Sequence, residues 1–388
     1  MIEMEVMMKE LGEIITGNTP SKKTEAFWNS EDICFVKPDV IADNGIDEIM
    51  DANEYISEEA REKARVVGKN SIFVTCIGII GKIGIASDGE YAFNQQINAI
   101  IPNKRVQPKY LAYNLLFNRP RLVAIANAPV VPIINKSQFG EFTVNIETDI
   151  DRQCEIVEVL DKLTQIIQQR NKEVIALDNL IKARFVEMFG DPIKNPKGWE
   201  VVTIGDIVTE VKYGTSKPAV EGGKYPYLRM NNLTSDGHLD LNDLKYIDIS
   251  EDEIEKCVVR KGDVLFNRTN SIELVGKTAV FDLPDDMVIA GYIIRVRLNE
   301  RMLPEVLSQY MNLEALKDIL RSMAKGAVNQ ANINAQELQS IKVYIPDMGL
   351  QKKFIEMKEQ VDKSKVAIQK ALDKTQILFD SLMQEYFG

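Results

Sequence analysis

The stretch from Asp149 to Phe189 contains neither proline nor glycine, so nothing in it has to break a helix. Gly190 stands where a C′ glycine ends a helix, and Pro192 prevents its continuation. Apolar residues recur at every seventh position, as in the seam of a coiled coil: Leu160, Ile167, Val174, Ile181 and Met188. We therefore expect one helix that spans roughly 60 Å and needs a partner for its apolar stripe.

A second apolar row supports the same interpretation but is incomplete. Leu163 and Leu177 belong to this row, whereas Arg170 and Arg184 interrupt it. Because polar residues at seam positions can fix the register between two helices, we expect both arginines to act in this way.

The end of the chain, Gln351 to Phe387, supplies the partner. It also lacks proline and glycine, and it closes on Phe387-Gly388 as the first stretch closes on Phe189-Gly190. Its apolar residues at heptad spacing are Phe354, Met357, Val361, Ile368, Leu378 and Leu382. Two unrelated bundle helices are the alternative, but the matched endings favour a duplicated unit.

An internal repeat covers the whole chain, because residues 1–190 align with residues 191–388. Matched segments keep their order: Val66-Val67-Gly68-Lys69 with Val258-Val259-Arg260-Lys261, Gly81-Lys82 with Gly276-Lys277, Pro108 with Pro304, and Ile134-Asn135 with Ile333-Asn334. We predict two duplicated modules of mixed α/β (α+β) class, at 1–148 and 191–346. Two long coiled-coil helices, at 149–190 and 347–388, separate them.

Within the modules, runs of β-branched and aromatic residues predict strands at Ile33–Val36, Ser71–Ile77, Ile97–Ile101, Tyr225–Leu228, Asp263–Phe266 and Tyr292–Leu298. Prolines at first-turn positions open the predicted helices Pro108–Asn118 and Pro304–Leu313. Proline and glycine in Asp191–Gly198 predict the linker into the second module.

The net charge of −11 argues against nucleic acid as a partner, but the charge is unevenly placed. Between Arg61 and Lys136 the acidic residues are Glu62, Asp88 and Glu90, and the basic ones are Arg61, Lys63, Arg65, Lys69, Lys82, Lys104, Arg105, Lys109, Arg119, Arg121 and Lys136. A local basic surface is compatible with DNA binding, and a merely solvated face is the alternative.

The distribution of cysteines and of apolar residues indicates the cellular compartment in which the chain is expected. The cysteines are scattered along the chain, at Cys34, Cys76, Cys154 and Cys257. With His238 as the sole histidine, we expect neither a zinc site nor a disulfide framework, and we expect a reducing cytoplasm. The most apolar run, Ser71 to Ala86, is interrupted by Lys82, so we expect no membrane span.

Two polar loops occupy the same position in the repeat, and their small hydroxyls and lysines suit phosphate contacts. Glycine lets the backbone of each loop approach a ligand closely. The candidate residues are Thr19, Ser21, Lys22 and Lys23 in the first module and Lys212, Tyr213, Thr215, Ser216 and Lys217 in the second. Taken singly, each loop is more often an ordinary turn than a binding site.

Other polar side chains have the donors and acceptors that read base edges. Arginine binds guanine O6 and N7 bidentately, and asparagine or glutamine can do the same to adenine N6 and N7. The candidates are Asn94, Gln95 and Gln96 in the first module and Arg229, Asn231, Asn232, Arg268, Thr269 and Asn270 in the second. A polar loop that satisfies its own backbone is the competing interpretation for each.

Catalytic and cofactor motifs are missing, which predicts a chain that is no enzyme and holds no cofactor or metal of its own. The segment Ser271 to Thr278 is nearly a Walker A loop, but Ser271 replaces its first glycine. Its repeat partner Gly81-Lys82-Ile83 has no hydroxyl, so we interpret the segment as a strand with a turn. One histidine excludes most histidine-based chemistry, and no adenine-methylation or GxGxxG motif is present.

Several segments together resemble a known family. In the first module they are Gly17-Asn18-Thr19-Pro20-Ser21, Phe27-Trp28 and Phe35-Val36-Lys37; in the second they are Asn195-Pro196-Lys197-Gly198-Trp199-Glu200 and the run from Lys261 to Asn270. They resemble target recognition domains, and the whole chain resembles a specificity (S) subunit of a type I restriction–modification enzyme. Ile72 to Cys76 departs from the pattern because it lacks an Arg-Thr-Asn ending, so a base contact inferred for Arg268 does not transfer there.

The resemblance implies that the two helices form an antiparallel pair with one module at each end. It also implies that each module reads one half of a split, asymmetric sequence in double-stranded DNA, and that the helices set the spacer. It adds Lys37 to the candidate DNA-binding residues. Methylation and cleavage would belong to modification (methyltransferase) subunits, docked on the helices, and to restriction (helicase–nuclease) subunits. S-adenosylmethionine, ATP and Mg²⁺ would bind to those partners.

Three alternatives remain open at this point. The chain could be the recognition subunit of a related methylation-dependent defence system, or a coiled-coil assembly scaffold whose duplicated modules bind protein. A stand-alone nuclease or ATPase is opposed by the missing catalytic sets and the broken Walker loop.

Overall fold

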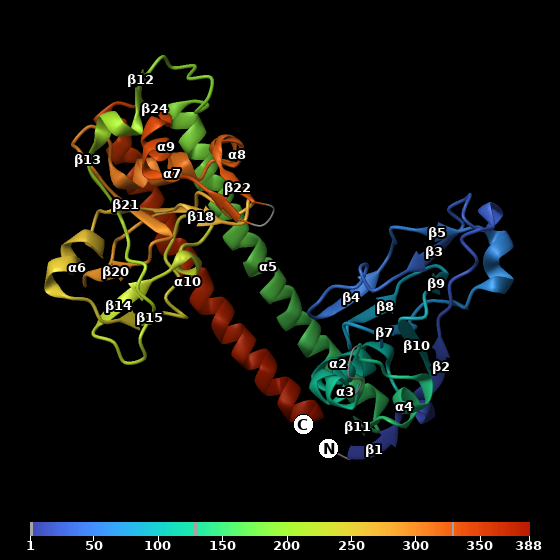
Figure 1. The fold of residues 1–388 in the computed structure, drawn as a ribbon. Coiled ribbons are helices and arrows are strands. Elements are labelled where there is room, and N and C mark those ends of the chain that lie inside the picture. Colours follow the sequence, from blue (N-terminus) through green and yellow to red (C-terminus); the bar gives the residue numbers. More distant parts are fainter. Residues whose placement is uncertain (1–2, 127–130, 328–329) are drawn as a thin grey trace. The chain divides into compact units, whose positions relative to one another are not determined.

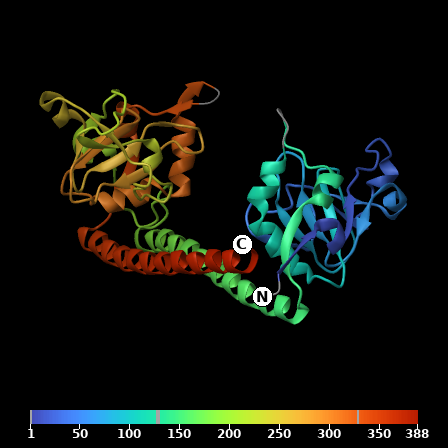
Figure 2. The same ribbon diagram turned by 90° about the horizontal axis from the view of Figure 1, so that it is seen from below.

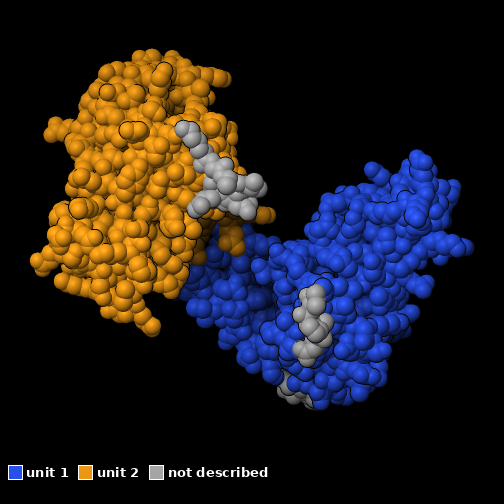
Figure 3. All heavy atoms as spheres, viewed as in Figure 1, with its two compact units in different colours: residues 1–170, 371–388 blue, residues 171–370 orange. Residues whose placement is uncertain are grey.

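The computed structural model describes residues 3–126, 131–327 and 330–388 of the chain. The chain divides into two compact units, residues 1–170 with 371–388 and residues 171–370 (Figure 3). Each unit combines one module with part of each long helix. The predicted boundaries between modules and helices stay a prediction.

The two long helices are α5 (Ile150–Phe189) and α10 (Met348–Phe387), shown in green and red in Figure 1. Acidic caps explain where they begin: the Asp149 carboxylate accepts the amide of Asp151, and the Asp347 carboxylate accepts the amide of Gly349 at 2.8 Å. Gly190 ends α5 with a φ of +92°, as predicted. The second helix begins before the predicted Gln351 because the Asp347 cap admits Gly349 into the first turn.

The first module contains a succession of short strands and helices. Its elements are β1 (Glu3–Met7), α1 (Met8–Leu11), β2 (Gly12–Thr16), β3 (Ile33–Val36), β4 (Ile46–Ile49), β5 (Tyr55–Ile56), β6 (Val66–Val67), β7 (Ile72–Thr75), β8 (Ile83–Ala86), β9 (Tyr91–Phe93), β10 (Ile97–Pro102), α2 (Pro108–Phe117), α3 (Arg119–Ile125), α4 (Lys136–Glu141) and β11 (Thr143–Glu147). Strand β7 is shorter than the predicted Ser71–Ile77, because the chain turns through Gly78 and Gly81 at positive φ.

The second module repeats this succession with additions. Its elements are β12 (Glu200–Thr203), β13 (Val208–Tyr213), β14 (Tyr225–Leu228), β15 (Lys245–Ile247), α6 (Glu251–Cys257), β16 (Val258–Val259), β17 (Val264–Asn267), β18 (Thr269–Asn270), β19 (Thr278–Val280), β20 (Met287–Ile289), β21 (Ile293–Leu298), α7 (Pro304–Met311), α8 (Glu314–Met323), β22 (Lys325–Ala327), β23 (Gln330–Asn332), α9 (Ala335–Ser340) and β24 (Lys342–Ile345).

Strand order confirms the duplication. In the first module the sheets run β2-β10-β7-β8-β4, β5-β3-β9-β6 and β1-β11; in the second they run β13-β21-β17-β19, β15-β14-β20-β16 and β12-β24. Each sheet of the first module has a counterpart in the second in which the corresponding strands are neighbours in the same order; β4 is the added edge strand of the first module. A further sheet, β18-β23-β22, forms in the second module.

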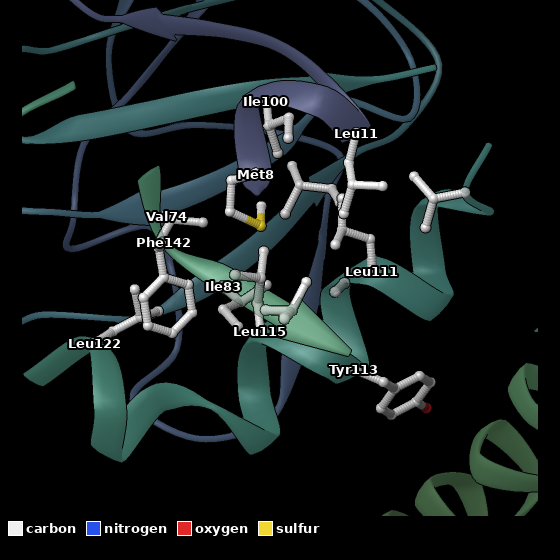
Figure 4. Packing of buried hydrophobic residues seen from close by; sticks show 14 of the residues in the cluster. Met8, Leu11, Val74, Ile83, Ile100, Leu111, Tyr113, Leu115, Leu122 and Phe142 are labelled. Carbon is white, nitrogen blue, oxygen red and sulfur yellow. The ribbon is translucent and has the colours of Figure 1, made fainter. Parts of the chain in front are cut away.

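Each module packs against both long helices within its own unit. In the first unit, side chains from β7, β8, β10, α2 and β11 meet in one core (Figure 4), which also takes Leu160 of α5 and Phe387 of α10. The ring of Phe387 lies 5.1 Å from that of Tyr110. In the second unit, the ring of Phe185 in α5 lies 5.3 Å from that of Phe354 in α10. The two helices are therefore antiparallel, as the ribbon of Figure 2 also shows.

The seam between the helices agrees with the prediction at Arg170 and differs from it at two positions, Arg184 and Leu378. The Arg170 guanidinium donates to the carbonyl of Ala371 at 2.5 Å and to the Thr375 hydroxyl, so this arginine does join the two helices. The prediction for Arg184 was wrong, because it forms an ion pair with Glu187 on its own helix.

Leu378 was also wrongly placed in the seam, since its side chain is 49% exposed. The cause is geometric: a straight helix has about 3.6 residues per turn, so an apolar row drifts by roughly 20° per heptad. The neighbouring residues Phe185 and Phe379 take the seam positions.

A buried glutamine ties the first turn of each long helix to its module. Gln153 accepts the amide of Gln107 at 2.7 Å and donates to the carbonyls of Arg105 and Glu147. Gln351 makes the same three bonds, with the amide of Leu303 and the carbonyls of Arg301 and Pro346. Both side chains are 0% exposed. The repeat thus preserves a contact that fixes where each helix leaves its module.

Replacing Gln351 with Met should destabilise the second unit on the order of 2–4 kcal/mol, because one amide and two carbonyls lose their partners in a dry site. Differential scanning calorimetry would measure the lowered transition. The matched control is Gln360→Met, an exposed glutamine of the same helix, for which we expect a change within about 0.5 kcal/mol. Equal effects of the two variants would contradict an anchoring role.

A glycine in each module brings two loops into close contact. A Cβ on Gly17 would lie 2.2 Å from the carbonyl oxygen of Asn94, and one on Gly214 would lie 2.2 Å from that of Ile289. The amide of Gly17 donates to Ile97, and that of Gly214 donates to Ile293. Glycine is required here because backbone, not a movable side chain, occupies the space.

Gly17→Ala should lower the stability of the first unit by roughly 1–3 kcal/mol, because the clash forces the loops apart. Thermal unfolding followed by circular dichroism would detect it. Gly68→Ala is the control, since the nearest atom to its Cβ would be 3.9 Å away. A Gly17→Ala protein as stable as the wild type would show that the loops separate without cost.

Candidate nucleic-acid interface

In the first module, the predicted polar loops meet where β2 ends and β10 begins. The Thr19 hydroxyl donates to the Gln95 side chain at 2.9 Å, and the Asn94 amide donates to that of Gln96 at 2.8 Å. Thr19 and Gln95 are exposed, whereas Asn94 is buried. Asn94 also accepts the backbone amide of Gln96, so it shapes the turn while Gln95 and Thr19 face solvent.

A second group of candidates in this module surrounds Glu54. Lys22 and Lys37 both form ion pairs with its carboxylate, and the Lys22 ammonium lies 4.6 Å from the centre of the Trp28 ring. Burial alone would raise the pKa of Glu54, but the hydrogen bonds from the two lysines outweigh it and hold that pKa below its ordinary value. Ser21 and Lys23 are exposed beside this group.

In the second module, Arg268 and Tyr213 form the most distinctive pair. The guanidinium carbon of Arg268 lies 5.0 Å from the centre of the Tyr213 ring, a cation–π arrangement. The Arg268 Nε is buried without a hydrogen-bond partner in the described part of the chain. The Tyr213 hydroxyl accepts the amide of Ala335 at 2.8 Å, which holds the ring in place. Lys212 is exposed on the same strand.

The residues that follow Arg268 are occupied by internal contacts. The Thr269 hydroxyl donates to Asn332 at 2.9 Å, and Asn270 donates to Asn267 at 2.9 Å. Thr269 and Asn270 form β18, which pairs with β23. Their polar groups are therefore committed to the framework of the second module, and Thr269 is itself buried.

The loop after β13 is held by a buried tyrosine. The Tyr227 hydroxyl lies 3.1 Å from the carbonyl of Thr215 and 3.0 Å from that of Lys217. Ser216 is exposed between them, and the Lys217 ammonium forms an ion pair with Glu253. The loop is therefore fixed in shape with Ser216 outward.

Beyond β14, Arg229, Asn231 and Asn232 lie in one turn. Asn232 is 2% exposed, accepts the amide of Arg229 and donates to the carbonyl of Asp240, so its groups are committed to the backbone. Arg229 forms a 2.6 Å ion pair with Asp243. Asn231 is exposed. The structure gives Asn232 a structural role and leaves Asn231 and part of Arg229 accessible.

Equivalent backbone bonds match positions between the modules. The amide of Cys76 donates to Gln96, and that of Arg268 donates to Tyr292. Cys76 and Arg268 are therefore equivalent, as are Gln96 and Tyr292. Tyr292 is 49% exposed and was missed among the candidates. The internal repeat could have identified Tyr292, because the equivalent residue of the first module, Gln96, was already a candidate.

The basic stretch Arg61 to Lys136 does not form a free basic patch throughout. Arg61 binds Glu58 and Glu90, Lys69 binds Asp88, Lys82 binds Asp43, and Lys109 binds Asp161. Several of these carboxylates lie outside the stretch, so counting charge along the sequence overestimated the local excess.

The near-Walker segment is a turn followed by a strand, as predicted. Lys277 leads into β19, and the amides of Val275 and Gly276 donate to Ser271 and Asn267. Backbone amides that would cradle phosphates are therefore already used. Among the described residues, no cluster of three or more His, Cys, Asp or Glu side chains is placed to hold a metal ion. No helix in that part of the chain has the length and apolarity needed to cross a membrane.

Comparison with known proteins gives the same picture from independent sequences. The specificity subunit of the type I restriction enzyme EcoKI from Escherichia coli K12 is 23% identical over 277 residues, which are 69% of this chain and 58% of the relative. The MjaIX specificity subunit of Methanocaldococcus jannaschii is 28% identical over 251 residues, 58% of this chain and 57% of the relative. The chain thus aligns with little more than half the length of these curated relatives.

Solved structures confirm the predicted fold class. The type I restriction–modification S subunit from M. genitalium matches with a TM-score of 0.58 at 15% identity, covering 100% of this chain and 96% of that one. A chain from a structural study of the assembly and conformational transition of the type I system matches with a TM-score of 0.59 at 16% identity, covering 99% and 97%. At these identities the likeness establishes the fold.

A family model described as the type I restriction modification DNA specificity domain matches the chain twice, at residues 2–176 and 196–377. The two matches correspond to the two halves of the internal repeat and favour a recognition subunit over an assembly scaffold. The chain therefore belongs to the type I restriction–modification DNA specificity family.

Proposed function

We propose that this chain is the non-catalytic recognition subunit of a type I restriction–modification complex and that each module reads one half of a bipartite, asymmetric DNA sequence. The observation that carries the proposal is the double match to the specificity-domain model, one for each half of the repeat. Two modules with one framework and different exposed side chains suit a target whose halves differ.

In the second module, Arg268 is the residue we assign to base reading. Its guanidinium is stacked on Tyr213, and its Nε lacks a partner among the described residues, so the group is oriented but not satisfied. A fixed, partly desolvated guanidinium fits the bidentate acceptors O6 and N7 of guanine. Exposed Tyr292, whose carbonyl accepts the Arg268 amide, would line the same contact.

In the first module, Cys76 stands at the position of Arg268, so the reading chemistry must differ. Thr19, Gln95 and Gln96 offer hydroxyl and amide groups at the equivalent surface, and amides suit adenine. Phosphate contacts are assigned to residues around these surfaces. The exposed ones are Ser21, Lys22, Lys23, Lys212, Ser216, Lys217 and Asn231, and the half-buried ones are Lys37, Thr215 and Arg229. Asn94, Asn232, Thr269 and Asn270 would support the loops rather than touch bases.

The helices would set the spacer and carry the docking surface for modification subunits. Exposed apolar side chains do occur on them, since Ile175 is 60% exposed, Val366 is 54% exposed and Ile377 is 68% exposed. Single exposed apolar residues are ordinary on protein surfaces, so the docking role rests on the family resemblance and not on these residues. Restriction subunits would complete the complex, with S-adenosylmethionine, ATP and Mg²⁺ on the partners. A cytoplasmic location follows, because chromosomal DNA is the substrate.

Genome-wide mapping of N6-methyladenine tests the recognition role. Cells with the gene should show one bipartite methylated motif that is lost when the gene is deleted. Arg268→Ala should relax specificity at one base pair of one half-site, since a bidentate pair contributes about 1–3 kcal/mol of discrimination. Arg268→Lys should relax it as well, because lysine keeps the charge and loses the fork.

The matched control is Arg260→Ala, because that guanidinium is held by Glu255 at 2.7 Å and Asp286 at 3.1 Å. We expect the methylated motif to be unchanged in that variant. If deletion of the gene left every methylated motif in place, the role in DNA recognition would be contradicted. If Arg268→Ala changed both half-sites, the assignment of one module to one half-site would be contradicted.

Insertion of one heptad after Ile167 and one after Thr375 tests the spacer. The paired insertion adds about 10 Å to both helices, equivalent to roughly three base pairs of duplex. We expect a longer spacer between unchanged half-sites in the methylation map. Insertion into one helix alone should abolish modification, because the seam around Arg170 and Thr375 loses its register. If the paired insertion left the spacer length unchanged, the helices would not set the distance between the half-sites.

A further inference from the structure

Lys82 and Lys277 occupy equivalent places in the two modules. Each ends the turn between two central strands: the carbonyl of Lys82 accepts the amide of Thr75 at 3.1 Å, and that of Lys277 accepts the amide of Asn267 at 2.8 Å. Both side chains are 8% exposed. The repeat therefore places a buried ammonium at the same point twice.

In the first module this ammonium is fully satisfied. The Lys82 Nζ donates to the carbonyls of Pro38 at 3.0 Å and Ile41 at 2.8 Å, and it lies 2.9 Å from the Asp43 carboxylate. Arg119 closes the space from the other side by donating to the carbonyls of Ile80 and Asp43. A segment of the chain that carries carbonyls and one carboxylate fills the site.

In the second module the equivalent ammonium is left without a partner. Among the residues that the structure describes, no acceptor or carboxylate bonds to the Lys277 Nζ, and burial lowers its pKa. The acid that follows β14, Asp236, instead lies 3.5 Å from Lys365 of α10. The carboxylate that could have paired with Lys277 is thus held elsewhere.

Lys277 lines a cavity of about 360 Å³ that α5, the turn before β19 and α8 enclose within the second unit. A second ammonium lies in the same wall: Lys317 donates to the carbonyl of Gly276 at 2.7 Å and to Asn312 at 2.8 Å. Burial lowers the pKa of Lys317 to about 7.

The acidic side chains of the cavity are bonded to other groups, although the charge of Glu314 also acts on Lys317 and partly offsets the effect of burial on its pKa. Asp178 and Asp236 bind Lys365, and Glu314 binds Arg321 at 2.6 Å. The remaining one, Glu273, is bonded within its own turn by Ser271 and its own amide. Lys182 adds an exposed positive charge to the lining.

We propose that this cavity binds a small oxyanion, a carboxylate or a phosphate group, with Lys277 as its charge partner and Lys317 as a second donor. The Lys277 ammonium is partly desolvated and has no charge partner among the described residues, so an anion that enters the cavity gains an ion pair without displacing another one. The first module shows what fits, because a carboxylate and two carbonyls occupy the equivalent place around Lys82. The site differs from a Walker-type nucleotide loop, because the backbone amides of its turn are already hydrogen-bonded within the protein.

The test compares thermal unfolding of the full-length protein in inorganic phosphate, in succinate and in chloride at equal ionic strength. The wild type should melt at a higher temperature in phosphate, in succinate or in both, and the effective anion identifies the ligand class. Lys277→Met should abolish the anion-dependent shift. Lys82→Met, the matched control, should keep it while lowering the baseline melting temperature, because Asp43 and two carbonyls lose their partner.

Lys277→Met also has a ligand-free expectation that keeps the test valid for a folded variant. Replacing this partly desolvated, unpaired charge by an apolar side chain should raise the melting temperature in chloride by about 2–4 °C. Calorimetric titration of the wild type near pH 7 in buffers of different ionisation enthalpy should show proton uptake, because a bound anion raises the pKa of Lys317.

Three results would overturn the proposal. If phosphate or succinate raised the melting temperature of Lys277→Met as much as that of the wild type, the anion would bind elsewhere. If neither anion raised the melting temperature of the wild type, the proposed site would not bind an anion. A lower baseline melting temperature for Lys277→Met would show that the ammonium already has a structural partner.

Discussion

Everything in each unit depends on how a forty-residue helix is joined to a small mixed module. The junction is a fully buried glutamine, Gln153 or Gln351, whose amide satisfies one backbone donor and two acceptors that belong to the module. No apolar residue could fill that place without leaving three polar groups unpaired in a dry core. Since the bonds are directional, they fix the exit angle of the helix as well as its attachment.

The second dependence is on residues distant in sequence. The core of the first unit is completed by Met383 and Phe387, from the last turns of α10, and that of the second by Phe185 and Phe189 of α5 beside Phe354. A module therefore buries its apolar surface only when the complementary helix end is present. Contacts of such sequence separation cost loop-closure entropy before they stabilise, so the first unit can finish folding only after the chain is complete.

Strong periodicity let the sequence predict the framework. Both long helices, the repeat and the strands Ile33–Val36 and Tyr225–Leu228 are where alternation and heptads placed them. Contacts between distant residues were beyond reach: the carboxylate that neutralises Lys109 is Asp161, and Arg184 left the seam because helical drift favoured Phe185. Site candidates suffered in the same way, since only three-dimensional packing shows that Asn232 serves its own turn and that Tyr292 is exposed.

Divergence between the two halves follows a physical rule. Positions on which the backbone framework depends are the same in both modules. At Gly17 and Gly214 any side chain would clash with backbone, and at Gln153 and Gln351 any apolar side chain would leave backbone groups unpaired. Positions that reach the solvent differ, as at Gln96 and Tyr292, and at the neighbouring pair a buried Cys76 corresponds to a partly exposed Arg268. A duplicated module can acquire a second specificity only where the framework does not depend on the side chain. The equivalent loops of this chain differ at such positions, so its two halves share one fold while presenting different chemistry.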